Sequence, residues 1–155
     1  MQQYLFRATG TILAMTYLTF VVTMHALWRL WLGIESDVAT RQTIAFGLGL
    51  LVVTTPLWWL HWRWMRWQLV DAAPARRHDF RTYVLVVAVV ALFAVFGSAG
   101  LGVAVLARLA LGVMETSAAG WAQSLLAVTA MLSATGVWYL HWGYIVQDQP
   151  GYDVG

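Results

Sequence analysis

Two blocks of tryptophan and histidine hold the residues whose types and spacing could do chemistry in this chain. The first reads WWLHWRWMRW over residues 58–67, and the second reads WYLHWGY over residues 138–144. Each block contains one histidine, His61 or His141, and a neutral imidazole nitrogen is a common axial ligand of a tetrapyrrole metal. The repeated motif therefore predicts either a cofactor site or a feature that the fold needs in two places.

A membrane interface would also produce such blocks. Amphipathic aromatic rings and arginine side chains gather at the level of the lipid headgroups. Residues four apart on a helix are neighbours, so Arg63 can lie over Trp59 or Trp67, and Arg66 over Trp62. We therefore expect a role at the lipid interface for these side chains, namely Trp58, Trp59, Trp62, Arg63, Trp64, Arg66, Trp67, Trp138 and Trp142.

The composition places the blocks in a membrane. The chain has 155 residues, of which 61% are hydrophobic and 10% are charged, and its mean hydropathy is +0.68. A helix spans a bilayer with roughly 20 apolar residues. Four stretches qualify, at about 8–31, 43–62, 83–107 and 121–142. They leave little chain outside the bilayer, and the longest connector, over 68–80, is expected to be a loop.

The second half of the chain repeats the first. Phe6-Arg7 is matched by Phe80-Arg81, and LWRLWLGI over 27–34 is matched by LARLALGV over 106–113. The two histidine blocks follow in the same order. Three matches in order predict a tandem duplication, with repeat 1 at about 6–68 and repeat 2 at about 80–148.

Each repeat is expected to form a two-helix hairpin, ended on the outer side by the capping residue types of 35–37 and 114–117. The fold class is therefore all-α and integral to the membrane: a four-transmembrane-helix bundle, with a twofold axis relating the hairpins, in a single membrane domain over 1–155. The bias of flanking arginines predicts that both termini are cytoplasmic. On that side lie Arg7, Arg63, Arg66, Arg76, Arg77 and Arg81, and on the other Arg29, Arg41 and Arg108.

Several interpretations of the histidines stay open. A twofold axis between His61 and His141 would let them share one haem. His25 lies inside the first apolar stretch, where an ionisable group is either a hydrogen-bonded helix contact or the ligand of a haem or bacteriochlorophyll at the bundle surface. His78 falls in the connector and is expected to be solvated.

Small residues on the third stretch predict close packing. Gly97, Gly100 and Gly102 would let another helix, a lipid or a carotenoid approach the backbone. Pro56 in the second stretch frees a backbone carbonyl and predicts a bend, which Gly136 permits in the fourth. These are features of a packed bundle.

The missing residue types restrict the function. There is no cysteine, and all nine basic residues are arginines at the ends of the apolar stretches. Lipid headgroups are therefore the expected partner of the positive charge, and nucleic acid is not. No Asp or Glu lies within the predicted span cores, and no catalytic motif is present, so we do not expect an enzyme.

The block PLWWLHWRW over 56–64, with Phe-Arg opening each hairpin, resembles an uncharacterised bacterial family of multi-spanning membrane proteins, a domain of unknown function associated with filamentous green phototrophs. The second block departs from it at Gly136 and Gly143. The resemblance implies a four-span bundle and favours a photosynthetic or respiratory complex. The expected function is a non-catalytic accessory subunit in contact with lipids and other integral membrane subunits of the bacterial inner membrane; the alternative is a tetrapyrrole-binding protein using His25 or the His61/His141 pair.

Overall fold

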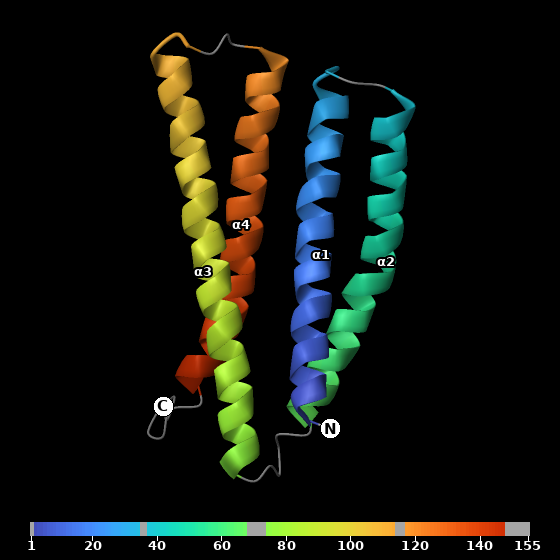
Figure 1. Ribbon diagram of the computed structural model, residues 1–155, viewed down its shortest axis with the longest axis vertical. Coiled ribbons are helices and arrows are strands. Elements are labelled where there is room, and N and C mark those ends of the chain that lie inside the picture. The colour runs from blue at the N-terminus through green and yellow to red at the C-terminus, as the bar shows by residue number, and fades with distance from the viewer. Residues whose placement is uncertain (1, 35–36, 68–73, 114–116, 148–155) are drawn as a thin grey trace.

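Four long helices make up the described part of the chain. The computed structural model describes residues 2–34, 37–67, 74–113 and 117–147. The helices are α1 (Gln2–Trp31), α2 (Val38–Trp67), α3 (Pro74–Ala110) and α4 (Ala118–Gln147), arranged as two hairpins side by side (Figure 1). We call the end where α1 begins and α4 ends the terminal end, and the end that carries the α1–α2 and α3–α4 turns the hairpin end. The all-α, four-helix expectation is confirmed.

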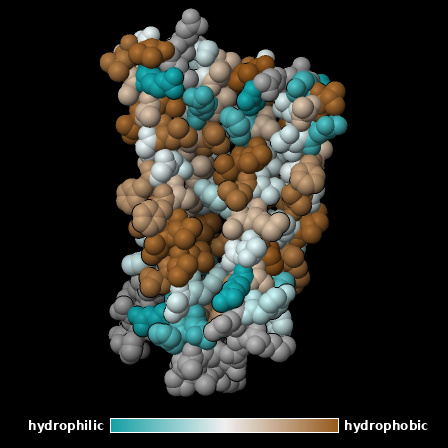
Figure 2. All heavy atoms as spheres, viewed as in Figure 1, coloured by the Kyte–Doolittle hydropathy of each residue, from teal (hydrophilic) through white to brown (hydrophobic). Residues whose placement is uncertain are grey.

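Every helix is long and apolar enough to cross a membrane. The qualifying spans are Tyr4–Trp31, Val38–Trp67, His78–Ala110 and Ala118–Tyr144. Hydrophobic residues cover the middle of the molecule, and hydrophilic residues gather toward its two ends (Figure 2). A bilayer core about 30 Å thick accommodates roughly 20 helical residues, so each helix continues past the core into the headgroup region. The chain is a multi-pass membrane protein.

The two hairpin turns begin with the same backbone motif. Gly33 and Gly112 both adopt positive φ, at 69° and 65°. Gly33 donates its N–H to Leu30 O at 3.1 Å and Ile34 to Arg29 O at 3.0 Å; the second hairpin repeats these two bonds at 3.1 and 3.0 Å, from Gly112 and Val113. This is the Schellman cap, which ends a helix at a glycine. The predicted duplication thus reappears in the geometry of both turns.

The second helix of each hairpin also starts alike. The Asp37 carboxylate accepts a hydrogen bond from the Thr40 N–H at 2.9 Å, and the Ser117 hydroxyl accepts one from the Gly120 N–H at 3.4 Å. Both side chains therefore act as N-caps, the role expected for the polar residues between the spans. The other capping candidates, at 35–36 and 114–116, lie outside the described residues.

The connector between the hairpins is shorter than predicted. A loop was expected over 68–80, but α3 begins at Pro74, so His78 and Asp79 are helical. Proline is favoured in the first turn of a helix, and the alanine and arginines that follow propagate it well. Hydropathy detects only the part of a helix that lies in the bilayer core, which is why the interfacial extension was missed. Residues 68–73 lie outside the described residues.

The hairpins pack mainly through α1 and α4. The two helices of each hairpin contact each other, and α1 also packs against α4 and, to a smaller extent, against α3. Across that contact the Tyr17 hydroxyl donates to Ala130 O at 3.2 Å, and the Trp28 indole N–H donates to the Thr129 hydroxyl at 3.1 Å. A twofold axis would pair α2 with α3 in the same way, but among the described residues their backbones do not meet. The expected twofold bundle is therefore open on that side.

Candidate functional site

A cluster of aromatic rings at the terminal end joins all four helices. Trp62 of α2 lies at its centre and is 5% exposed. Its ring stands 6.2 Å from Trp58, 5.1 Å from His141 and 5.2 Å from Tyr144, measured between centroids. Met65 of α2 is also buried in the cluster, and α1 and α3 contribute Leu5, Phe6, Phe80, Tyr83 and Val84. Trp62 was expected at the lipid interface, and the structure corrects this to the protein core.

The bend in α2 helps Trp62 to reach the second hairpin. Figure 1 shows α2 changing direction along its length, so that its last turns run behind α1. Pro56 lies inside this helix, where its ring removes one backbone hydrogen bond, which agrees with the bend predicted there. At the matching position of α4, Gly136 is exposed, and a Cβ added to it would meet no atom within 4 Å among the described residues.

His141 is buried at 1% exposure beside this tryptophan. Its Nδ1 lies 2.8 Å from Val137 O, so Nδ1 carries the proton and donates it, leaving the lone pair on Nε2. Nε2 is also buried, with no hydrogen-bond partner among the described residues. The ring contacts of His141 are with Trp62 and Tyr83, and His61 is not among them.

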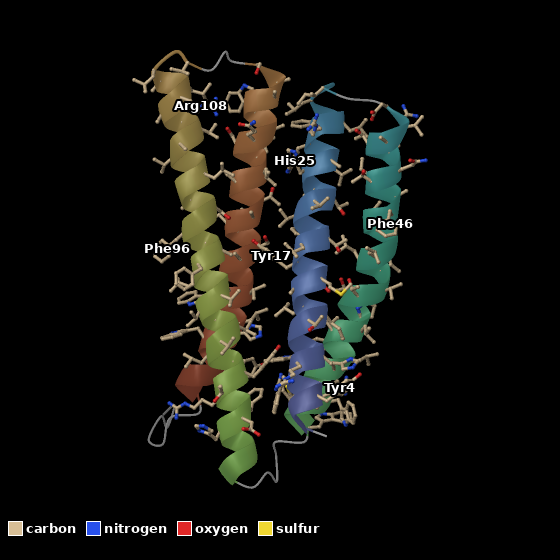
Figure 3. All side chains as sticks on the ribbon, in the orientation of Figure 1. Tyr4, Tyr17, His25, Phe46, Phe96 and Arg108 are labelled. Atoms are coloured by element: carbon tan, nitrogen blue, oxygen red, sulfur yellow. The ribbon has the colours of Figure 1, made fainter. Side chains whose placement is uncertain are left out.

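The other two predicted histidines lie elsewhere. His61 repeats the local bond of His141, with Nδ1 2.8 Å from Leu57 O, but it is only half-buried. Figure 3 places His25 on the side of α1 that faces α4, in the same contact region as Tyr17. The structure therefore brings none of the three histidines next to another.

The block residues outside the core are largely exposed. Most of the tryptophans in the two blocks are substantially exposed, with Trp59 at 52%, Trp64 at 50%, Trp67 at 64% and Trp142 at 43%. Trp138 is half-buried and stacks on Trp142 with 5.8 Å between centroids, as Trp58 does on Trp62. The exposure of these rings is compatible with lipid contact, and their position at the headgroup level stays a prediction.

The two arginines of the first block bind different rings. Arg63 lies over the Trp67 ring at 4.7 Å, which is one of the expected cation–π contacts. Arg66 does not lie over Trp62; it donates to the Tyr144 hydroxyl at 2.8 Å and lies over that ring at 5.1 Å. Because the Trp62 ring is buried, its face is not accessible to Arg66. Tyr144 of the second hairpin takes its place as the aromatic partner.

Only part of the predicted glycine face packs within the chain. A Cβ added at Gly102 would lie 3.8 Å from Ala127 of α4, whereas one added at Gly97 or Gly100 would meet nothing within 4 Å among the described residues. A closer contact lies between α1 and α2: a Cβ at Gly47 of α2 would lie 3.1 Å from the Cβ of Thr23 and would overlap its hydroxyl. The sequence indicates Gly47 only as one of the small residues of a packed bundle, and the structure shows Thr23 as its partner.

A groove of about 1040 Å³ opens between α1 and α3, with α4 as its floor. Leu13, Ala14 and Leu18 line one wall and Val86, Val90 and Ala94 the other. At the terminal end the lining turns polar, with Arg7 from α1 and His78, Asp79 and Thr82 from α3. Tyr83 lies between the polar and the apolar parts, and its buried hydroxyl has no hydrogen-bond partner among the described residues.

The groove was not predicted from the sequence. Its walls come from the first and third helices, and its mouth uses His78, expected to be solvated in a loop, and Asp79. One spacing in the sequence is consistent with the α3 wall: Asp79, Tyr83 and Val86 are four and three residues apart and therefore share a face of a helix. That pattern needed α3 to begin before residue 79, which hydropathy did not indicate.

These features define a class: a small multi-pass helical membrane protein with an aromatic cluster at one end and an amphipathic groove between its hairpins. Comparison of the chain with protein-family models, with curated proteins and with solved structures finds no match. The resemblance to the uncharacterised membrane family therefore stays a prediction.

Proposed function

We propose that this protein is a non-catalytic accessory subunit that packs against a larger membrane complex. One observation carries the proposal: a face of small residues on α3 has no partner helix within the described chain. Gly97, Gly100, Ala104 and Ala107 follow at spacings of three, four and three and are all exposed. A Cβ added at either glycine would meet no atom within 4 Å among the described residues.

Small residues at helical spacing support close approach of a second transmembrane helix. In a bilayer, where lipid tails are as apolar as leucine, association depends on such close packing. Large apolar side chains flank the α3 face, with Phe93 at 73% and Phe96 at 66% exposed, and Figure 3 shows Phe96 projecting away from the bundle. A helix of another subunit would fill the space between these side chains and the glycines.

The sequence indicates the kind of complex. Its lack of catalytic motifs favours a supporting role, and the family resemblance of the block over 56–64 favours an energy-transducing complex, photosynthetic or respiratory. We place the protein in a bacterial inner membrane, with the terminal end cytoplasmic because six of the nine arginines flank that side.

The test is the native size of the protein in gently solubilised membranes of its source. Mass spectrometry of the native-gel band should find it with subunits of a reaction centre, antenna or oxidase. Gly100→Leu should release it from that band, because a leucine blocks close helix approach. Gly49→Leu is the matched control, since Gly49 is also exposed and open but shares its face with only one other small residue, Ala45, and not with a run of four. Migration of the wild type alone would overturn the proposal.

A second candidate function is tetrapyrrole binding, and His61 is its best-placed ligand. The bond from Nδ1 to Leu57 O leaves the Nε2 lone pair available, and the half-buried ring has room for a haem or bacteriochlorophyll that buried His141 lacks. The purified protein should then show a Soret or Qy band that His61→Ala removes. His25→Ala and His141→Ala test the other two ligands. A colourless protein from its native membrane would remove this candidate.

A further inference from the structure

The inter-hairpin groove has the proportions of a lipid from one leaflet. Its lining runs from Phe6 to Leu18 on α1 and from His78 to Ala94 on α3. At about 1.5 Å per residue these stretches are about 18 and 24 Å long. One leaflet with its headgroups is about 20–22 Å thick, half of the full bilayer. The groove therefore extends from the headgroup level to about the middle of the membrane.

The chemistry of the lining changes along this length in the order of a phospholipid. Arg7 and Asp79 stand at the mouth, on opposite walls. One turn deeper come small or hydroxyl-bearing residues, Gly10, Thr11 and Tyr83, and beyond them the lining is almost wholly aliphatic, with Val86 and Val90 on α3. Both walls show the same order because both helices enter the membrane from the same end.

The mouth carries one charge of each sign. Among the described residues no ion pair joins Arg7 to Asp79, so the two groups do not neutralise each other. A guanidinium binds phosphate well, and a carboxylate accepts charge-assisted hydrogen bonds from an ammonium group. A zwitterionic headgroup with a primary ammonium meets both requirements. An anionic headgroup would face the Asp79 carboxylate, and a quaternary ammonium has no N–H to donate to it.

The buried hydroxyl of Tyr83 supports the same occupant. Tyr83 is 9% exposed, lines the groove one turn below Asp79, and its hydroxyl has no hydrogen-bond partner among the described residues. A buried hydroxyl without a partner is costly, so an acceptor is expected from outside the chain. The ester carbonyls of a glycerolipid lie at this depth below the phosphate and supply one.

We propose that the groove between α1 and α3 binds one phosphatidylethanolamine-type lipid. Its phosphate meets Arg7, its ammonium group meets Asp79, its ester region meets the Tyr83 hydroxyl, and one acyl chain lies along the aliphatic walls. This site lies nearer the terminal end of α3 than the small-residue face does, because its lining ends at Ala94 and that face begins at Gly97. Lipid binding in the groove does not require assembly into a larger complex.

The test is lipid retention by the purified full-length protein, measured by native mass spectrometry after titration with phosphatidylethanolamine, phosphatidylcholine or phosphatidylglycerol. We expect one phosphatidylethanolamine per chain, bound about tenfold more tightly than phosphatidylcholine. Asp79→Asn should remove this preference, and Arg7→Gln should weaken binding of both zwitterionic lipids. Arg63→Gln is the control for charge, because Arg63 lies at the same end but outside the groove.

A pair of groove variants separates specific from adventitious lipid. Ala14 and Ala45 are both exposed helical residues of the first hairpin, but only Ala14 lines the groove. Ala14→Phe should abolish retention of the single lipid, and Ala45→Phe should not. Equal retention by both variants, retention of a neutral prenyl lipid in place of a phospholipid, or unchanged headgroup preference in Asp79→Asn would each overturn the proposal. Circular dichroism of each variant checks that the helices are intact.

Discussion

Trp62 shows how one repeated residue takes different roles in the two halves of the molecule. In repeat 1 the tryptophan is buried and the neighbouring His61 is half-exposed; in repeat 2 the histidine, His141, is buried and the matching Trp142 is 43% exposed. The two blocks therefore turn different faces toward the same cluster, about 100° apart on a helix. This rotation is why the histidines do not meet across an axis.

Removing the Trp62 ring should destabilise the fold more than any other change in the two blocks. Trp62→Ala deletes a buried ring that contacts α3 and α4, and we expect a loss of about 3–5 kcal/mol in the free energy of unfolding. Trp142→Ala is the matched control in the other repeat and should cost about 0.5 kcal/mol or less, since its ring is partly exposed. Reversible unfolding in mixed micelles, followed by circular dichroism, measures both; equal losses would contradict a core role for Trp62.

Both hairpins have a close helix contact at equivalent positions, but the glycine lies on the second helix in repeat 1 and on the first helix in repeat 2. In repeat 1 threonine on the first helix meets glycine on the second, Thr23 against Gly47; in repeat 2 the equivalent pair is Gly102 against Ala127. Each pair keeps one small partner where the helices approach. The contact therefore constrains the combined size of the pair and not either residue alone.

Gly47→Ala should therefore destabilise the first hairpin. The added methyl group would overlap the Thr23 side chain, and such overpacking costs about 1–3 kcal/mol. Gly49→Ala, two residues away, meets no neighbour and should leave the melting temperature unchanged or slightly higher. Adding Thr23→Gly to Gly47→Ala copies the second hairpin and should recover part of the loss. A double variant no more stable than Gly47→Ala would argue against this steric account.

The two hairpins are more alike at their helix ends than along the faces of their helices. Both hairpins end their first helix at a positive-φ glycine and start their second helix at a polar N-cap, whereas the facing side chains have diverged. A cap must satisfy backbone groups that no other residue can reach. Side chains along the helices need only fill space, so many combinations serve.

The Asp37 cap of α2 should make the stability of the protein depend on pH. The Thr40 backbone N–H, hydrogen-bonded to the carboxylate, holds the pKa of Asp37 below its ordinary value of 3.8. A lowered pKa in the folded state means that the capping contribution is fully present above about pH 4 and is lost as the pH falls through the lowered value. Asn is a comparable cap that does not titrate. The stability advantage of the wild type over Asp37→Asn should therefore shrink as the pH is lowered from about 5 to about 2.

Melting curves of the two proteins across this range provide the test. Asp37→Ala, which has no capping group, should melt below both at neutral pH. A wild-type advantage that does not change with pH would show that the charge of Asp37 contributes nothing to the cap. Global effects of acid on the bundle cancel in the difference between wild type and Asp37→Asn.

At the scale of the whole molecule, the hairpins meet mainly along α1 and α4 and at the terminal end. Polar links at Tyr17 and Trp28 join the hairpins through the membrane, and the Trp62 cluster joins them at the terminal end. The groove exists because this contact is one-sided. A closed, symmetric bundle would have filled it with side chains.

The orientation of the whole molecule is testable because the chain has no cysteine of its own. Val113→Cys places one thiol at the hairpin end and Trp67→Cys one at the terminal end, at positions 68% and 64% exposed. With the terminal end cytoplasmic, a membrane-impermeant maleimide should label Val113→Cys in intact cells and Trp67→Cys only after permeabilisation. The reverse pattern would overturn the orientation that the arginine count predicts.

The sequence alone determined the features that depend on composition and local spacing. Four apolar stretches predicted four helices, and repeated turn residues predicted two hairpins, because hydropathy and backbone caps act over a few turns of one helix. The bend was predicted for the same reason, since Pro56 alters hydrogen bonds only within its own helix.

Only the tertiary structure decided which faces meet. The burial of Trp62 and His141, the choice of Tyr144 as the partner of Arg66, and the groove between α1 and α3 all depend on how far one hairpin is rotated and shifted against the other. In a bilayer nearly every face of these helices is apolar, so hydropathy does not distinguish lipid-facing from protein-facing residues. That choice rests on shape complementarity between side chains far apart in the chain.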